Sequence, residues 1–191
     1  MPVAFCLFVA ASACHPANTP AATAPPACPT GDTLVQVDAE AAALAGCTSI
    51  SGRLAIGPSF ALGSLAGLDR IERVGGLDIS DNAGLSGVYL PALVDVDGDL
   101  VIDDNRQVAT VSLHHLVEVR GDLTVRDNRA LTRLDLGALR RVGGRLVVSG
   151  HPSLDTVVLD RLQRAGPLVL EDNPAWPAED VDGLRRRVSP P

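Results

Sequence analysis

Short stretches of alternating apolar and polar residues recur along this chain at intervals of 23 residues. Such alternation over a few residues is typical of a strand with one buried face. Each stretch begins with a leucine: Leu54, Leu77, Leu100, Leu123, Leu146 and, after 22 residues, Leu168. A glycine lies shortly before most of these leucines, and a second apolar series follows each of them in register. The sequence therefore predicts a repeat protein whose coils stack on one another, because a single coil buries too little surface to be stable alone.

The segments between these strands lack the length and the 3.6-residue periodicity of a helix. Asp-Asn and Gly-Gly dipeptides mark turns instead. We expect an all-β fold, a right-handed parallel β-solenoid with coils of about 23 residues, in which equivalent strands lie about 4.8 Å apart. Residues 177–191 predict a short capping helix and tail, because Pro177 precedes two acidic residues and three Arg end the segment. Trp176 is expected to pack over the last coil.

A polar residue follows the same strand in each coil. A buried polar row must be hydrogen-bonded, and asparagine suits turns because its amide bonds the nearby backbone. We expect an internal ladder of asparagine side chains. His151 interrupts the row, and we expect it to be a hydrogen-bonded turn residue rather than a ligand. The ladder residues are Asn82, Asn105, Asn128 and Asn173.

The first 27 residues predict export. Residues 1–13 are apolar and end in small residues, as a signal peptide does. Ala11-Ser12-Ala13 before Cys14 resembles a bacterial lipobox. This resemblance implies that Cys14 carries lipid and, because His15 follows it, that the protein is displayed at the outer membrane or cell surface; plain secretion is the alternative. The four prolines in residues 14–27 predict an extended tether that reaches about 40 Å.

Cys28 and Cys47 follow the tether, and in an exported protein they are expected to form a disulfide. Closing a loop of about 20 residues stabilises a fold by roughly 3 kcal/mol. The bond would also close the first coil, whose strand is otherwise an open edge.

The segments Cys28-Pro-Thr-Gly and Leu44-Ala-Gly-Cys47, with the V-x-G-x-L-x-I-x-x-N-x-x-L coils up to Asn173, resemble the receptor L domain. That solenoid occurs in the ectodomains of insulin-type and epidermal-growth-factor-type receptors and in fungal cell-wall and bacterial surface proteins. The resemblance covers residues 28–176 and implies recognition at a cell surface. The chain has one such module and no cysteine-rich domain, so growth-factor binding is not implied. A leucine-rich-repeat horseshoe is the alternative fold.

The charges exclude some partners. The chain has 23 acidic and 16 basic residues, a net charge of -7, and every basic residue is arginine. An acidic chain with 3% aromatic residues is a poor ligand for nucleic acid. No apolar run is long enough to span a bilayer, so a lipid anchor is the only membrane contact expected. Residues 28–105 carry 12 acidic residues and three Arg, whereas residues 106–191 carry 11 and 13. The solenoid is therefore expected to be polarised along its axis.

We find no catalytic set and expect no cofactor. His114 and His115 are adjacent, so they do not share one face of a strand. Five acids lie close together without the glycine and glutamate of a calcium loop. We expect cross-coil ion pairs to explain most of this cluster, with arginines at 73, 120 and 126 next to the acids at 95, 97 and 103. Asp95, Asp97 and Asp99 are expected to point outward from one strand, and a weak cation site is the alternative to pairing. The remaining two acids are Asp103 and Asp104.

We therefore expect a non-enzymatic, monomeric surface module that binds a protein or an envelope glycan. Its binding face would be the outward positions of one sheet. One alternative is a structural envelope protein without a specific ligand. Another is a β-helix carbohydrate-active protein, which would require Asp103, Asp104 and Asp127 to converge in a groove. The expected face comprises Asp78, Ser80, Val101, Asp103, Thr124, Arg126, Val147 and Ser149.

Overall fold

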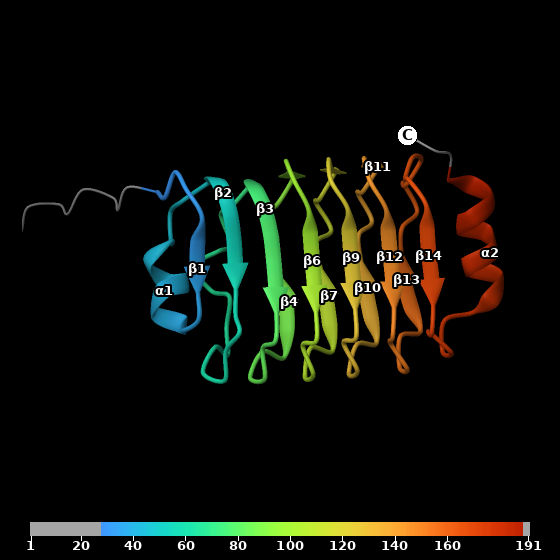
Figure 1. The fold of residues 1–191 in the computed structure, drawn as a ribbon, viewed down its shortest axis with the longest axis horizontal. Helices are drawn as coiled ribbons and strands as arrows, with labels where there is room; N and C mark the ends of the chain where they lie inside the picture. Colours follow the sequence, from blue (N-terminus) through green and yellow to red (C-terminus); the bar gives the residue numbers. More distant parts are fainter. Residues whose placement is uncertain (1–27, 189–191) are drawn as a thin grey trace, which may run out of the picture.

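The computed structural model describes residues 28–188 (Figure 1), so the expected signal peptide, Cys14 and the whole tether lie outside the described residues. All strand pairs are parallel, and strands of one coil pair with the equivalent strands of the next. The leading leucines align, with Leu77 opposite Leu100 and Leu123 opposite Leu146. The predicted β-solenoid with 23-residue coils is therefore confirmed.

Each regular coil contributes strands to three parallel strips. The main strip contains β1 (Thr33–Val35), β2 (Ser49–Ile56), β3 (Arg73–Ser80), β6 (Leu100–Asp103), β9 (Leu123–Arg126), β12 (Leu146–Ser149) and β14 (Leu168–Glu171). The side strip, joined to β3, contains β5 (Asp95–Val96), β8 (Glu118–Val119) and β11 (Arg141–Val142). A separate second sheet contains β4 (Gly87–Tyr89), β7 (Thr110–Ser112), β10 (Arg133–Asp135) and β13 (Thr156–Val158).

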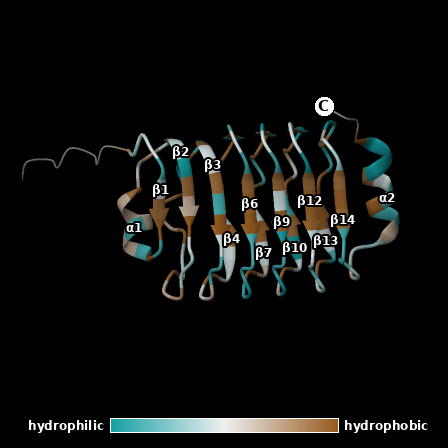
Figure 2. Cartoon of the chain, in the orientation of Figure 1, coloured by the Kyte–Doolittle hydropathy of each residue, from teal (hydrophilic) through white to brown (hydrophobic). Residues whose placement is uncertain are grey.

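Rows of Leu, Ile and Val fill the interior, and their side chains are almost completely buried from the first coil to the last. Figure 2 shows the corresponding hydrophobic bands along the stacked strands. The interior of a thin coil leaves little space for aromatic rings, and of the described aromatic residues only Trp176 joins the core, at the C-terminal end.

Glycines at the corner between the side strip and the main strip allow the coils to approach closely. A Cβ atom on Gly75 would lie 2.2 Å from the carbonyl oxygen of Ser51, and one on Gly98 would lie 2.7 Å from that of Gly75. Backbone therefore lies against backbone at this corner, and a larger residue would separate the coils.

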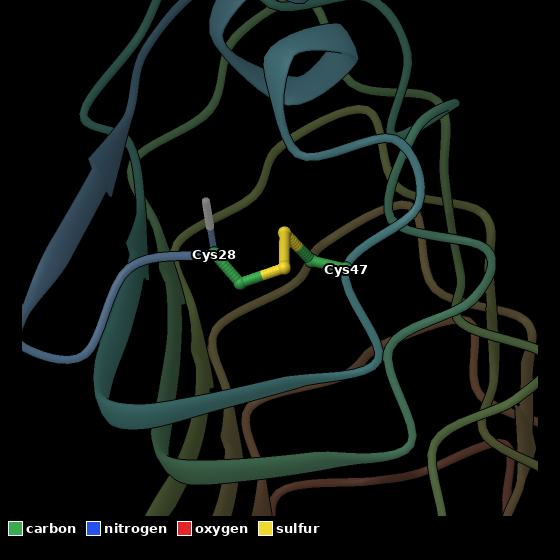
Figure 3. The surroundings of a disulfide bond; sticks show 2 residues. All are labelled: Cys28 and Cys47. Atoms are coloured by element: carbon green, nitrogen blue, oxygen red, sulfur yellow. A yellow bond between two sulfur atoms is a disulfide. The ribbon is translucent and has the colours of Figure 1, made fainter. Parts of the chain in front are cut away.

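Different structures close the two ends (Figure 1). At the C-terminal end, helix α2 (Ala178–Arg187) covers the last coil with Leu184, and Trp176 is 6% exposed, as the sequence predicted. At the N-terminal end, the disulfide between Cys28 and Cys47 is present, with the two Cα atoms 5.5 Å apart (Figure 3).

Helix α1 (Asp38–Ala43), next to the first strand, was not predicted from the sequence. Its six residues are too few to show a helical period, and Ala41 is its only buried residue. The Glu40 side chain accepts hydrogen bonds from the backbone N–H groups of Gln36 and Val37, which fixes the start of the helix.

Candidate functional site

The asparagine row forms the expected ladder inside the turn after the main strip. The Nδ2 group of Asn105 donates to the carbonyl oxygens of Ile79 (2.8 Å) and Asp103 (3.0 Å). Its Oδ1 atom accepts from the backbone N–H of Asn82 (3.2 Å) and from the Asn82 amide. Asn128 makes the same bonds one coil later. The ladder is thus a structural element that holds each turn to its neighbour, and its members from Asn82 to His151 are buried.

His151 takes the place of asparagine in this ladder and is fully buried. Its Nδ1 atom lies 3.2 Å from the backbone nitrogen of Asn128, which donates to it, and its Nε2 atom lies 3.1 Å from the carbonyl oxygen of Val125. The Nδ1 atom also lies 3.3 Å from the carbonyl oxygen of Asn128, so backbone groups surround both ring nitrogens. Burial lowers the pKa of His151 below the ordinary value of 6.5. The prediction of a hydrogen-bonded turn residue is confirmed.

The residue before each ladder position has a left-handed backbone, a feature that was not predicted from the sequence. Asp81, Asp104, Asp127 and Asp172 have φ angles between 47° and 56°, and Gly150 has a φ of 76°. Aspartate tolerates this conformation better than most residues. The Asp-Asn dipeptide was the available signal, because the first residue turns the chain and the second enters the ladder.

The expected binding face is the outer face of the main strip. One outward row runs from Asp78 through Val101, Thr124 and Val147 to Val169, and all five side chains are partly exposed. The described helices lie at the ends of the stack rather than across this face (Figure 1). The main strip therefore presents a flat surface with an aliphatic centre.

A polar row borders the aliphatic one. It contains Ser80, Asp103, Arg126, Ser149 and Glu171 in register. Arg126 lies 2.5 Å from Asp103, and the hydrogen bond and charge of that carboxylate raise the pKa of Arg126. Asp78 of the first row pairs with Arg53 and accepts a hydrogen bond from Ser80. The structure therefore brings the predicted face residues together on one surface.

The acidic cluster between residues 95 and 104 is divided among separate partners. Asp95 pairs with Arg73 at 2.7 Å, Asp97 pairs with Arg120, and Asp103 pairs with Arg126. These three cross-coil pairs were predicted and are confirmed.

The prediction that Asp95, Asp97 and Asp99 share one strand is wrong, because β5 ends at Val96 and Asp99 precedes β6 in the corner. Asp99 instead accepts a hydrogen bond from the backbone N–H of Asp122 at 2.8 Å. In the part of the chain that the structure describes, no group of three or more His, Cys, Asp or Glu side chains is placed to hold a metal ion.

The carbohydrate-enzyme alternative requires the carboxylates of Asp103, Asp104 and Asp127 to converge in one groove, and they do not. Asp104 lies 3.6 Å from Arg106, and Asp127 lies 3.4 Å from Arg126. A groove of about 860 Å³ beside α2 is lined by Asp127, but its lining includes neither Asp103 nor Asp104. The groove therefore does not bring together the three carboxylates that this alternative requires.

One contact between polar side chains was not foreseen. The hydroxyl oxygen of Ser112 lies 3.1 Å from Nδ1 of His114, and Nδ1 of His115 lies 2.6 Å from the carbonyl oxygen of Pro91. Both histidines are exposed on the turn after β7. Asp135 is opposite Ser112 in the sheet but bonds Arg133 and the Gly137 N–H group instead. The described hydrogen bonds therefore include none from a carboxylate that would orient His114.

No family model, curated protein or solved structure matches this chain. Neither described helix is long and apolar enough to cross a membrane.

Proposed function

We propose that the protein is a non-enzymatic recognition module that binds its partner through the outer face of the main strip. The observation that carries this proposal is the uncovered, in-register row of Val101, Thr124, Val147 and Val169 beside a row of charged and hydroxyl side chains. Flat repeat faces of this kind supply extended binding surfaces. An aliphatic centre with a polar border also matches the organisation of protein interfaces.

The partner that fits this face is a protein or an envelope glycan, bound by a single copy of the chain. Membership of the receptor L-domain family, which we propose from the residues quoted above, supports a role in recognition. The polar row from Ser80 to Glu171 supplies hydrogen-bond donors and acceptors at intervals of about 4.8 Å. This spacing suits an extended chain that runs along the stack.

We place the protein at the outer membrane or cell surface, held by lipid on Cys14. The Cys28–Cys47 disulfide supports export, because such bonds persist in oxidising compartments. Mass spectrometry of the mature N-terminus tests the anchor, and a diacylglyceryl mass on Cys14 is the expected result. An unmodified Cys14, or cleavage at another residue, would overturn this placement.

The binding face is tested by cross-linking capture from the native cell envelope with the full-length protein. Arg126→Glu places a repulsive charge beside Asp103 in the face, and we expect it to lower capture at least tenfold. Arg133→Glu is a matched control, because Arg133 is also exposed and lies 3.0 Å from one aspartate, Asp135, but belongs to the second sheet. Equal loss in both variants contradicts the assigned face. Absence of any captured partner favours a structural envelope role.

A further inference from the structure

Five exposed arginines gather at the C-terminal end of the side strip, and we call them the arginine patch: Arg140, Arg141, Arg161, Arg164 and Arg187. Arg141 and Arg164 are paired in neighbouring coils. The backbone N–H groups of Gln163 and Arg164 both donate to the carbonyl oxygen of Arg140, at 3.0 and 3.3 Å. A guanidinium nitrogen of Arg187 lies 2.8 Å from the carbonyl oxygen of Leu159, so the last turn of α2 contacts the turn that carries Arg161.

The arginine patch departs from the charge pattern of the earlier coils. There, each arginine of an ion pair faces an acidic residue in one neighbouring coil and no arginine in the other, as for Arg73 with Asp95 and Arg120 with Asp97. In the patch, Arg141 is followed by Arg164 at the distance of one coil, about 4.8 Å. Like charges directly opposite each other in a sheet are destabilising.

Few acidic groups neutralise these charges. Glu118 lies 3.6 Å from Arg141, and it also lies 3.9 Å from Arg120. Asp160 is exposed in the turn next to Arg161. Within residues 28–188, the four other arginines of the patch form no ion pair.

Capping of the helix explains only part of the patch. Arginines in the last turn of α2 interact favourably with the helix dipole, which accounts for Arg187. Arg140, Arg141 and Arg164 belong to the solenoid and gain nothing from that dipole. Their clustering therefore points to an anionic group that the described chain does not supply.

We propose that the arginine patch binds an acidic polysaccharide with a carboxylate on successive sugars. Guanidinium groups bind carboxylates through two parallel hydrogen bonds. The arginines follow neighbouring coils, so a linear polymer can contact them in turn. The net charge of -9 over residues 28–105 repels an extended anionic surface. A single polysaccharide chain can still bind at the C-terminal end of the solenoid, away from that charge.

Two observations favour a polysaccharide over a lipid surface or nucleic acid. The exposed large apolar side chains of the described chain all lie before residue 95, away from the patch: Leu34, Val37, Phe60, Tyr89 and Val94. Insertion into lipid would need such side chains beside the basic residues. Trp176 is buried, so the patch has no aromatic platform for bases. The patch lies on the side strip and not on the face proposed above, so the two proposals fail independently.

The test measures binding of full-length protein to polygalacturonate by titration calorimetry at low and high salt, with neutral dextran as the control polymer. We expect binding to polygalacturonate alone, weakened by salt. The double variant Arg141→Gln/Arg164→Gln should lose at least tenfold in affinity and show a smaller salt dependence. Arg70→Gln/Arg129→Gln is the matched control, because these exposed arginines also form no described ion pair, and it should stay within twofold of the parent.

The patch variant removes two like charges and breaks one weak contact with Glu118, so circular dichroism should show an unchanged fold. Failure of the parent protein to bind polygalacturonate at low salt overturns the proposal. Equal affinities of the patch and control variants also overturn it. Tighter binding to phosphatidylglycerol vesicles or to polyglutamate than to polygalacturonate would reassign the patch to a lipid or a protein partner and reject the polysaccharide.

Discussion

Two rows run side by side along the solenoid, one inside the turn and one on its surface. The inner row consists of the ladder amides, each fully buried up to Asn128, and the outer row includes the pair Asp103–Arg126. The same coil-to-coil register creates both rows. The two rows differ in solvent access. Water can replace a lost partner in the outer row, but it cannot reach the buried groups of the inner row. Stability should therefore depend on the inner row far more than on the outer one.

The largest expected effect is that of Asn105→Ala. This change leaves the backbone N–H of Asn82 without its acceptor and removes the amide donor to the carbonyl oxygens of Ile79 and Asp103. The Asp103 oxygen keeps its bond from the Asp81 N–H. At about 1–3 kcal/mol for each buried group, we expect a loss on the order of 3–5 kcal/mol in the free energy of unfolding, measured by urea denaturation. Asn173→Ala, at the half-buried end of the ladder, serves as the comparison and should cost less. Equal losses would show that burial does not distinguish the ladder positions.

An intermediate effect is expected from pH through His151. Because burial lowers its pKa in the native state, the unfolded chain takes up a proton below pH 6.5 that the native protein refuses. Its contribution to stability is complete above pH 6.5 and is lost as the pH falls toward the native pKa, at up to about 1.4 kcal/mol per pH unit. Hydrogen bonds to the backbone of Val125 and Asn128 oppose this lowering of the pKa, and the carboxylates of Asp127 and Asp103 oppose it less.

Urea midpoints at pH 8 and pH 5 measure this effect. His151→Asn restores an amide to the ladder and should remove most of the pH dependence in that interval. His114→Asn, an exposed control, should leave it in place. A pH dependence that persists in His151→Asn would assign it to other groups.

The smallest effect is expected from Arg126→Gln in the outer row. Both side chains of its pair with Asp103 reach solvent, so the loss should be under about 1 kcal/mol. The difference from the parent should vanish in 1 M salt, where surface charges are screened. A larger loss that salt does not reduce would mean that the outer row contributes to stability as the inner one does.

The sequence was sufficient to predict the features that follow from strict repetition. Once the coils are in register, a spacing of 23 residues becomes spatial adjacency, so the Asn105–Asn128 contact and the Asp103–Arg126 pair could both be predicted. The left-handed backbone of Asp104 was not predicted, because a turn signal does not specify dihedral angles. Helix α1 is too short for a periodic pattern.

The arginine patch and the Ser112–His114 contact could not be predicted from the sequence for a different reason. Arg187 joins the patch because α2 folds back against the turn at Leu159, which no repeat dictates. Ser112 and His114 are two residues apart in the sequence, and only the turn after β7 brings their side chains within 3.1 Å. Features that break the repeat are therefore the ones that sequence periodicity cannot supply.

The closed ends of the stack also determine how such a protein can change in length. The disulfide and α1 protect one end, and α2 with Trp176 protects the other, while each coil between them contacts only its neighbours. Duplication of a 23-residue segment such as 101–123 would add one coil, about 4.8 Å of length and one outward position in each row. A duplicated segment of the gene would thus correspond to one coil of the structure. The binding face could be lengthened in this way without a change at either end.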